Sequence, residues 1–215
     1  QVILSVSAVL MPILAFGVPN SLVKFYSSFK NDSSQDGFLT LMLVLPLVLI
    51  IPIGILSYFA NEAIGNLLSK ENDIVRDYVW HIFFVGMAMA YFEVFYAWAR
   101  IRMKSMFGNF MKEVFCRIAQ TILLILLWFK IIDIEFFING LVGCYIVRTV
   151  IMKIYAYQLR KPKLNFSFPE NWQSIVKYSA LIILGGSTAI VLMEVDKVML
   201  NNFLKIENVA YYAVA

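Results

Sequence analysis

Six apolar stretches, each about long enough to cross a lipid bilayer, occupy most of this chain. A helix needs about 20 apolar residues to span the hydrocarbon core. Only 15% of the residues are charged, whereas soluble domains carry about a quarter. The sequence therefore predicts an all-α integral membrane protein with six full transmembrane helices and the start of a seventh near Val209. The predicted spans are Val2–Val23, Phe38–Ala60, Tyr78–Ala99, Phe110–Phe129, Phe136–Tyr157 and Ser174–Phe203.

The two ends of the chain lie inside apolar sequence. Gln1 is followed directly by an apolar run, and Ala215 lies a few residues into another. We therefore interpret the chain as a fragment of a longer, transporter-sized protein. Residues 1–160 are expected to form most of a first helical bundle, 161–173 a cytoplasmic linker, and 174–215 the start of a second bundle.

The polar breaks between the apolar stretches alternate in charge. The second and fourth breaks are rich in acidic residues, whereas Lys and Arg gather in and beside the first, third and fifth. Cytoplasmic loops of membrane proteins are enriched in Lys and Arg, so these three breaks are predicted to be cytoplasmic. Topology and contact with anionic lipid headgroups then account for the net charge of +4, and we expect no nucleic-acid partner. The basic residues of the three breaks and their flanks are Lys24, Lys30, Arg100, Arg102, Lys104, Lys112, Arg117, Arg148, Lys153, Arg160, Lys161, Lys163 and Lys177.

Several ionisable residues lie within or at the ends of the predicted spans, where a charge is costly and usually faces a cavity or a partner. Glu93 and Arg100 are seven residues apart and share one face of a helix. They form either a structural salt bridge against a neighbouring helix or part of a hydrophilic cavity. Arg148, near mid-depth, either snorkels to the interface or faces a water-lined cavity, where its guanidinium suits a phosphate or pyrophosphate. Lys24 either anchors at the headgroups or faces the mouth of the cavity.

Breaks inside the spans are candidate hinges. Pro19 lies in the first span, and Gly185 and Gly186 lie in the sixth; such residues allow either simple packing kinks or movement of a bundle. The sixth span continues to Glu194, Asp196 and Lys197, which form either an outer interface cap or, with Glu93, a set of gating or proton-coupling groups.

No pattern for catalysis is present in the sequence. Cys116 and Cys144 have neither metal-ligand spacing nor a disulfide framework, and His81 is the only histidine. We find no nucleophile–base arrangement and no phosphate-cradling glycine loop. We therefore expect no enzyme activity, no cofactor and no metal site.

Three stretches resemble motifs of the polysaccharide biosynthesis (O-antigen-type oligosaccharide) flippase family, part of the multidrug/oligosaccharidyl-lipid/polysaccharide exporter superfamily. Residues 16–27, FGVPNSLVKFYS, resemble the end of the family's second helix. Residues 99–105, ARIRMKS, followed by Gly108, resemble the basic loop after the fourth helix. EVDKVML at 194–200 and VAYYAVA at 209–215 resemble the seventh helix and the start of the eighth, although Asn201 stands where the family usually has glycine.

The resemblance implies about 12 to 14 helices in two bundles that give alternating access to a central, often cationic cavity near the membrane midplane. It implies a multi-pass protein of the bacterial cytoplasmic membrane that flips a polyprenyl-pyrophosphate-linked oligosaccharide for polysaccharide or lipopolysaccharide biosynthesis. H⁺ or Na⁺ is the expected coupling ion, membrane lipids are the other expected partners, and a monomer is the expected state. Arg148, Arg100 and Lys24 are the cations expected to bind the pyrophosphate.

Two alternatives remain at this point. A drug/cation antiporter of the same superfamily would favour acidic residues in the cavity, whereas Arg and Lys are in excess near the third to fifth spans. An integral-membrane glycan-processing enzyme would need clustered catalytic acids and histidines or a large outer loop, and the longest predicted outer break is short.

Overall fold

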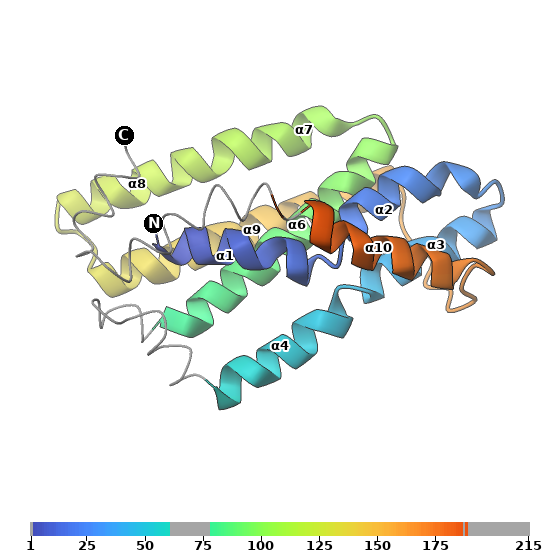
Figure 1. Cartoon of the computed structure of the whole chain (residues 1–215). Coiled ribbons are helices and arrows are strands. Elements are labelled where there is room, and N and C mark those ends of the chain that lie inside the picture. The colour runs from blue at the N-terminus through green and yellow to red at the C-terminus, as the bar shows by residue number, and fades with distance from the viewer. Residues whose placement is uncertain (1, 61–77, 187, 189–215) are drawn as a thin grey trace.

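The computed structural model describes residues 2–60, 78–186 and 188, and every regular element in these residues is helical (Figure 1). The predicted all-α class is confirmed for this part of the chain. In chain order the elements are α1 (Val2–Leu14), α2 (Val18–Phe25), the 3-10 turn η1 (Tyr26–Ser28), α3 (Asp32–Val44), α4 (Leu47–Phe59), α6 (Val79–Ile101), α7 (Ser105–Phe110), the π-helical segment η3 (Met111–Phe115), α8 (Cys116–Trp128), α9 (Ile134–Leu159) and α10 (Trp172–Gly186).

Helix α6 is the centre of the bundle and packs against α1, α2 and α9. In its most apolar window 72% of the residues are buried, compared with 28% for α9. Small residues such as Ala90 and Ala97 are fully or almost fully buried on α6, and small side chains let neighbouring helices approach closely. Ser7 of α1 ties the two helices together through a hydrogen bond from its hydroxyl to the carbonyl of Ile82 at 2.9 Å.

Three described helices are long and apolar enough to cross a membrane: Asp32–Phe59, Val79–Ile101 and Ile134–Leu159. A fourth span is formed if the bent pair Val2–Leu14 and Val18–Ser28 is counted as one. The chain is therefore a helical membrane protein by the length and composition of these helices. Six full spans remain a prediction, because the expected span Phe110–Phe129 is not among these candidates and much of the expected span Ser174–Phe203 lies outside the described residues.

The first predicted span is not the continuous helix that its apolar sequence suggests. It bends by 44° between α1 and α2. The break lies at Phe16 and Gly17, whose φ angles of 51° and 64° are left-handed. Pro19 stands in the first turn of α2, where its missing N–H is not needed. The bend thus precedes the predicted hinge proline, which begins the next helix.

The fourth predicted span, Phe110–Phe129, also differs from a simple helix. Its helix begins earlier, at Ser105, and η3 interrupts it with π-helical turns before α8 continues to Trp128. Gly108 lies where a side chain would clash with the ring of Tyr96 on α6, so this glycine lets α7 lie against the central helix.

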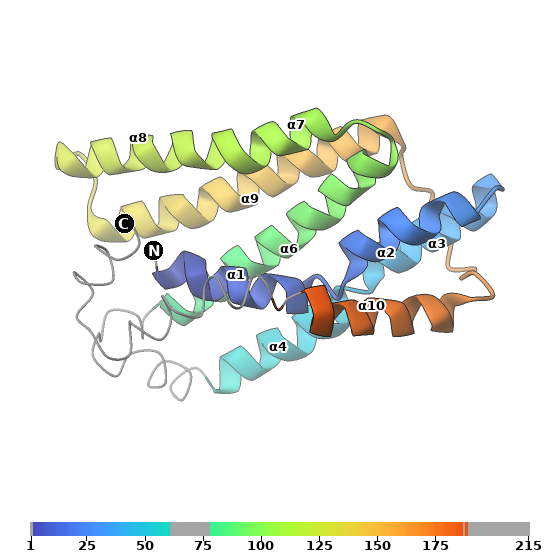
Figure 2. The ribbon, with the colours of Figure 1, turned by 45° about the horizontal axis from the view of Figure 1, so that its top comes forward.

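The three basic breaks of the sequence meet at one end of the bundle. The turn between α2 and α3, the turn between α6 and α7, and the connection from α9 to α10 lie together at the right of Figure 2. The charge alternation predicts this arrangement, and the assignment of that end to the cytoplasm remains a prediction from the charges.

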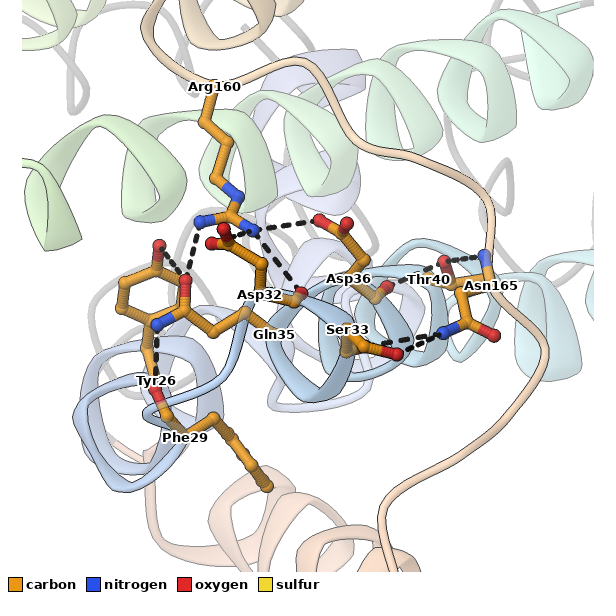
Figure 3. A network of polar contacts seen from close by, with 9 residues as sticks. All are labelled: Tyr26, Phe29, Asp32, Ser33, Gln35, Asp36, Thr40, Arg160 and Asn165. Carbon is orange, nitrogen blue, oxygen red and sulfur yellow. Dashed lines mark hydrogen bonds and ion pairs between the residues drawn. The ribbon is translucent and has the colours of Figure 1, made fainter.

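A polar network at this end attaches the connection after α9 to α3 (Figure 3). The guanidinium of Arg160 donates to Asp36 Oδ1 at 2.9 Å and to Asp32 Oδ1 at 3.3 Å, and it also bonds Gln35. Only 16% of the Arg160 side chain and 10% of the Asp36 side chain are exposed. Burial opposes the charged form of Arg160, but the hydrogen bond to Asp36 and the nearby carboxylates outweigh it and raise the pKa of Arg160. Asn165 extends the network: its backbone N–H donates to Thr40 Oγ1 at 3.0 Å.

We expect Arg160→Ala to reduce the free energy of unfolding by about 3 kcal/mol, the typical cost of removing one partner from a buried ion pair. The Asp36 carboxylate would remain buried without its cation. Thermal unfolding of the purified protein in detergent measures the change. Lys161→Ala, at the next and exposed position, is the control and should leave the midpoint nearly unchanged. Equal midpoints for both variants would contradict a stabilising role for the network.

Candidate functional site

The polar face of α6 begins with Glu93, which forms an ion pair with Lys112 of η3 at 2.6 Å. The Glu93 side chain is 17% exposed and that of Lys112 is 42% exposed. The sequence predicts Arg100 as the neighbour of Glu93 on the same helix face. In the structure the guanidinium of Arg100 lies 5.6 Å from the centre of the Tyr96 ring, and the carboxylate of Glu93 binds across to η3 instead.

The π-helical segment η3 and the start of α8 turn several polar side chains toward α6 and α9. π-helical turns inside longer helices are rare and frequently occur at functional sites. Sequence reasoning assigned Lys112 and Arg117 only to topology, and it missed Gln120. The spacing of these residues in the sequence could have identified them as one face of a helix. That face recurs in an otherwise apolar stretch at positions 112, 113, 116, 117 and 120.

A cavity of about 760 Å³ lies between α1, α6, η3, α8 and α9. Its volume is within the range of small-molecule sites, about 300–1,000 Å³. Both ionic and uncharged polar groups contribute to its wall. The lining residues are Leu4, Met11, Met89, Glu93, Lys112, Glu113, Cys116, Arg117, Gln120, Leu124, Phe137, Leu141, Tyr145 and Arg148.

Arg148 of α9 lies in the wall of this cavity with only 6% of its surface exposed. Its guanidinium carbon is 4.0 Å from the centre of the Phe92 ring and 4.7 Å from that of Tyr145. Both rings attract the cation through their π faces. Within the described residues no carboxylate forms an ion pair with Arg148, and its buried Nε has no hydrogen-bond partner there. Because a buried charge is costly without a counter-ion, this arrangement favours binding of an anion.

A second, smaller cavity of about 170 Å³ shares Glu93 and Lys112 with the first. Its wall also includes Arg100, Pro19 at the start of α2, and Ile182 of α10. The ion pair between Glu93 and Lys112 therefore lies in the wall that the two cavities have in common. The charged residues lining the two cavities are Arg100, Lys112, Arg117 and Arg148 on the positive side and Glu93 and Glu113 on the negative side, a net excess of cations.

Lys24 lies apart from the residues described as lining these two cavities. It is exposed at the end of α2, and its Nζ is 3.7 Å from the centre of the Tyr178 ring on α10. Phe25 meets the same ring edge-on at 5.3 Å. Ser21, one turn before Lys24 on α2, shares a hydrogen bond between hydroxyls with Ser179 of α10 at 2.6 Å. The position predicted for substrate binding thus takes part in the contact between α2 and α10.

The remaining predicted site residues lie at or beyond the end of α10. Gly185 and Gly186 form its last described turn, and no atom of another described helix lies within 4 Å of the position of a Cβ at Gly185. Glu194, Asp196 and Lys197 lie outside the described residues. In the part of the chain that the structure covers, no group of His, Cys, Asp or Glu is arranged to hold a metal ion.

Together these features define a helical membrane protein with cavities between its helices whose charged lining residues are mostly cations. The chain belongs to the polysaccharide biosynthesis protein family, whose model matches residues 1–215. The family resemblance of the sequence motifs is thereby confirmed, and membership ties the chain to polysaccharide biosynthesis. No curated protein and no solved structure matches the chain.

A cysteine placed at Gln120 should react with a charged, membrane-impermeant thiol reagent faster than one placed at Ile118. Gln120 lines the cavity, whereas Ile118 is an exposed apolar residue of α8 that we expect to face lipid. The thiolate is the reactive form, and hydrocarbon disfavours it, so we expect a difference of roughly tenfold or more.

The measurement uses a background in which Cys116 and Cys144 are replaced by alanine, and follows the rate of labelling in membrane vesicles. A cysteine at Gln120 that reacts as slowly as the one at Ile118 would show that water does not reach the cavity.

Proposed function

We propose that this protein flips a polyprenyl-pyrophosphate-linked oligosaccharide across the bacterial cytoplasmic membrane by alternating access. The observation that carries the proposal is Arg148: a buried cation in the wall of a large cavity, with no carboxylate partner among the described residues. Membership of the polysaccharide biosynthesis family supports a substrate of this class.

The chemistry of the substrate matches the cavity. A pyrophosphate cannot enter hydrocarbon unaccompanied, because each charge at the bilayer centre is costly. Arg presents a planar fork of N–H donors that fits phosphate oxygens, and such charge-assisted hydrogen bonds are among the strongest in proteins. Gln120 and Tyr145, which are joined by a hydrogen bond of 3.2 Å, offer uncharged polar groups for sugar hydroxyls.

The contact between α2 and α10 supports a gate at the end that carries the basic breaks. Ser21 and Ser179 bring the two helices close together, and the left-handed Gly17 at the α1–α2 bend leaves no room for a side chain beside the Ser179 carbonyl. In this proposal the bend at Phe16 and Gly17 is the hinge by which α2 moves away from α10. Pro19 stiffens the start of α2, and Lys24 stabilises the closed gate through Tyr178.

The roles proposed for the other predicted residues follow from their positions. Arg100 lines the smaller cavity and is proposed to meet the anion on its way to or from Arg148. Gly185 and Gly186 are proposed as a second flexible point, and Glu194, Asp196 and Lys197 as coupling groups for H⁺ or Na⁺. A drug/cation antiporter is a poorer match, because the described cavities have more cations than carboxylates.

Arg148→Gln should reduce flipping by roughly 10- to 100-fold, the effect of losing a hydrogen bond to a charged group. Arg148→Lys should retain part of the activity, because a lysine keeps the charge but not the fork. The matched control is Lys153→Gln on the same helix, since Lys153 is exposed, has its Nζ 5.6 Å from the centre of the Tyr157 ring, and is not among the residues that line the two cavities.

Transport of a fluorescent lipid-linked oligosaccharide into proteoliposomes measures the rates, with protein abundance checked in each preparation. We expect Arg100→Gln to have a smaller effect than Arg148→Gln, because Arg100 is exposed. Wild-type flipping by Arg148→Gln would refute the assignment of the binding site.

A further inference from the structure

The ion pair between Glu93 and Lys112 is open to both cavities, which a purely structural ion pair does not need to be. It lies in the wall shared by both cavities, and Lys112 remains 42% exposed while its nitrogen contacts Glu93 at 2.6 Å. Glu93 directly follows Phe92, the residue whose ring packs on the guanidinium of Arg148. The pair and Arg148 therefore line one cavity from neighbouring positions.

We infer that Lys112 is a second ligand for the pyrophosphate and that Glu93 pairs with Lys112 while the cavity is empty. When the anion enters, the Lys112 ammonium exchanges the Glu93 carboxylate for a phosphate oxygen; when the anion leaves, the ion pair forms again. The inference rests on the flippase function proposed above, and it deepens that function by naming a residue pair that sets the affinity of the site.

The charge of the ligand requires more than one cation. A pyrophosphate diester carries more than one negative charge, and Arg148 alone supplies a single positive charge. A lysine suits the second position, because its ammonium is a compact charge on a flexible stem and can turn between two acceptors. Arginine, with its rigid fork, is less suited to such an exchange.

The exchange also allows release. A site that conducts or transports a ligand must bind it strongly enough to capture it and weakly enough to let it go. Glu93 competes with the ligand for Lys112 and so limits the affinity.

The other ion pair of the larger cavity is the natural comparison. Glu113 and Arg117 are separated by 3.3 Å on one helical face, and their side chains are 59% and 79% exposed. Exposed ion pairs of this kind contribute little to the stability of a protein. Glu93, at 17% exposure, is far better placed to control its partner. Glu113→Gln is therefore the comparison that removes a cavity carboxylate without releasing Lys112, and Glu135→Gln, at an exposed carboxylate of α9 that lines neither cavity, is the control.

The experiment measures binding of a short-chain polyprenyl pyrophosphate to the purified full chain in detergent, with the corresponding polyprenyl alcohol as the uncharged control. Glu93→Gln should tighten pyrophosphate binding roughly two- to fivefold, because it frees Lys112 from a partly exposed pair. Lys112→Gln should weaken binding by roughly tenfold or more. The double variant should bind like Lys112→Gln, since Glu93 acts through Lys112. Glu135→Gln should bind like the wild type, and Glu113→Gln should tighten binding less than Glu93→Gln does.

In the transport assay, Glu93→Gln should lower both KM and the maximal rate, because tighter binding slows release. Unchanged or weaker binding by a folded Glu93→Gln protein would overturn the inference. So would unchanged binding by Lys112→Gln, and either variant decides the question alone if the other fails to fold.

The same measurements separate this inference from the proposed function. If Arg148→Gln weakens binding while the variants of the pair do not, only the role of Lys112 fails. If Arg148→Gln leaves binding unchanged, or the alcohol binds as well as the pyrophosphate, the proposed function itself fails.

Discussion

Charges in the interior of a membrane need a partner, water or a ligand, and this constraint shapes the centre of the bundle. Glu93 meets it by pairing with Lys112. Arg148 meets it only in part, because two aromatic rings cover its guanidinium while no carboxylate neutralises it among the described residues. The position of α6 makes both arrangements possible, since it presents Phe92 and Glu93 toward the helices that carry the opposing cations. The result is a cavity whose positive charge is not fully neutralised by the described carboxylates.

At the end of the bundle that carries the basic breaks, polar contacts join the helices to one another. Arg160 lies at the predicted membrane boundary, where its charge is held by Asp36, Asp32 and Gln35 rather than left to lipid headgroups. This network attaches the connection before α10 to α3, while Ser21 and Ser179 join α10 to α2. The position of α10 beside the smaller cavity thus depends on polar contacts at one end of the bundle and on Ile175, which is fully buried in the apolar core that α6 forms.

The sequence allowed the helical class, the approximate positions of the described spans and the family to be predicted. Arg148 was identified as a charge within a span, and its interpretation as cavity-facing or snorkelling needed the structure. The sequence allows Pro19 to be either a packing kink or a hinge. In the structure the bend lies at Phe16 and Gly17, and Pro19 stands in the first turn of α2, where a proline is well tolerated. For Lys112, the sequence indicates only a role in membrane topology, because a hydropathy pattern does not show the direction in which the lysine side chain points.

The sequence by itself determined that the chain forms apolar helices separated by alternately charged breaks, because hydrocarbon accepts only backbone whose polar groups are bonded internally. Only the tertiary structure decided which charges meet. Glu93 could have paired with Arg100 on its own helix; the π-helical turns of η3 and the packing of α7 on α6 through Gly108 brought Lys112 to it instead. The physical reason is that burial of apolar segments is nearly independent of their rotation about their own axes, whereas an ion pair depends on that rotation and on distances of a few ångströms.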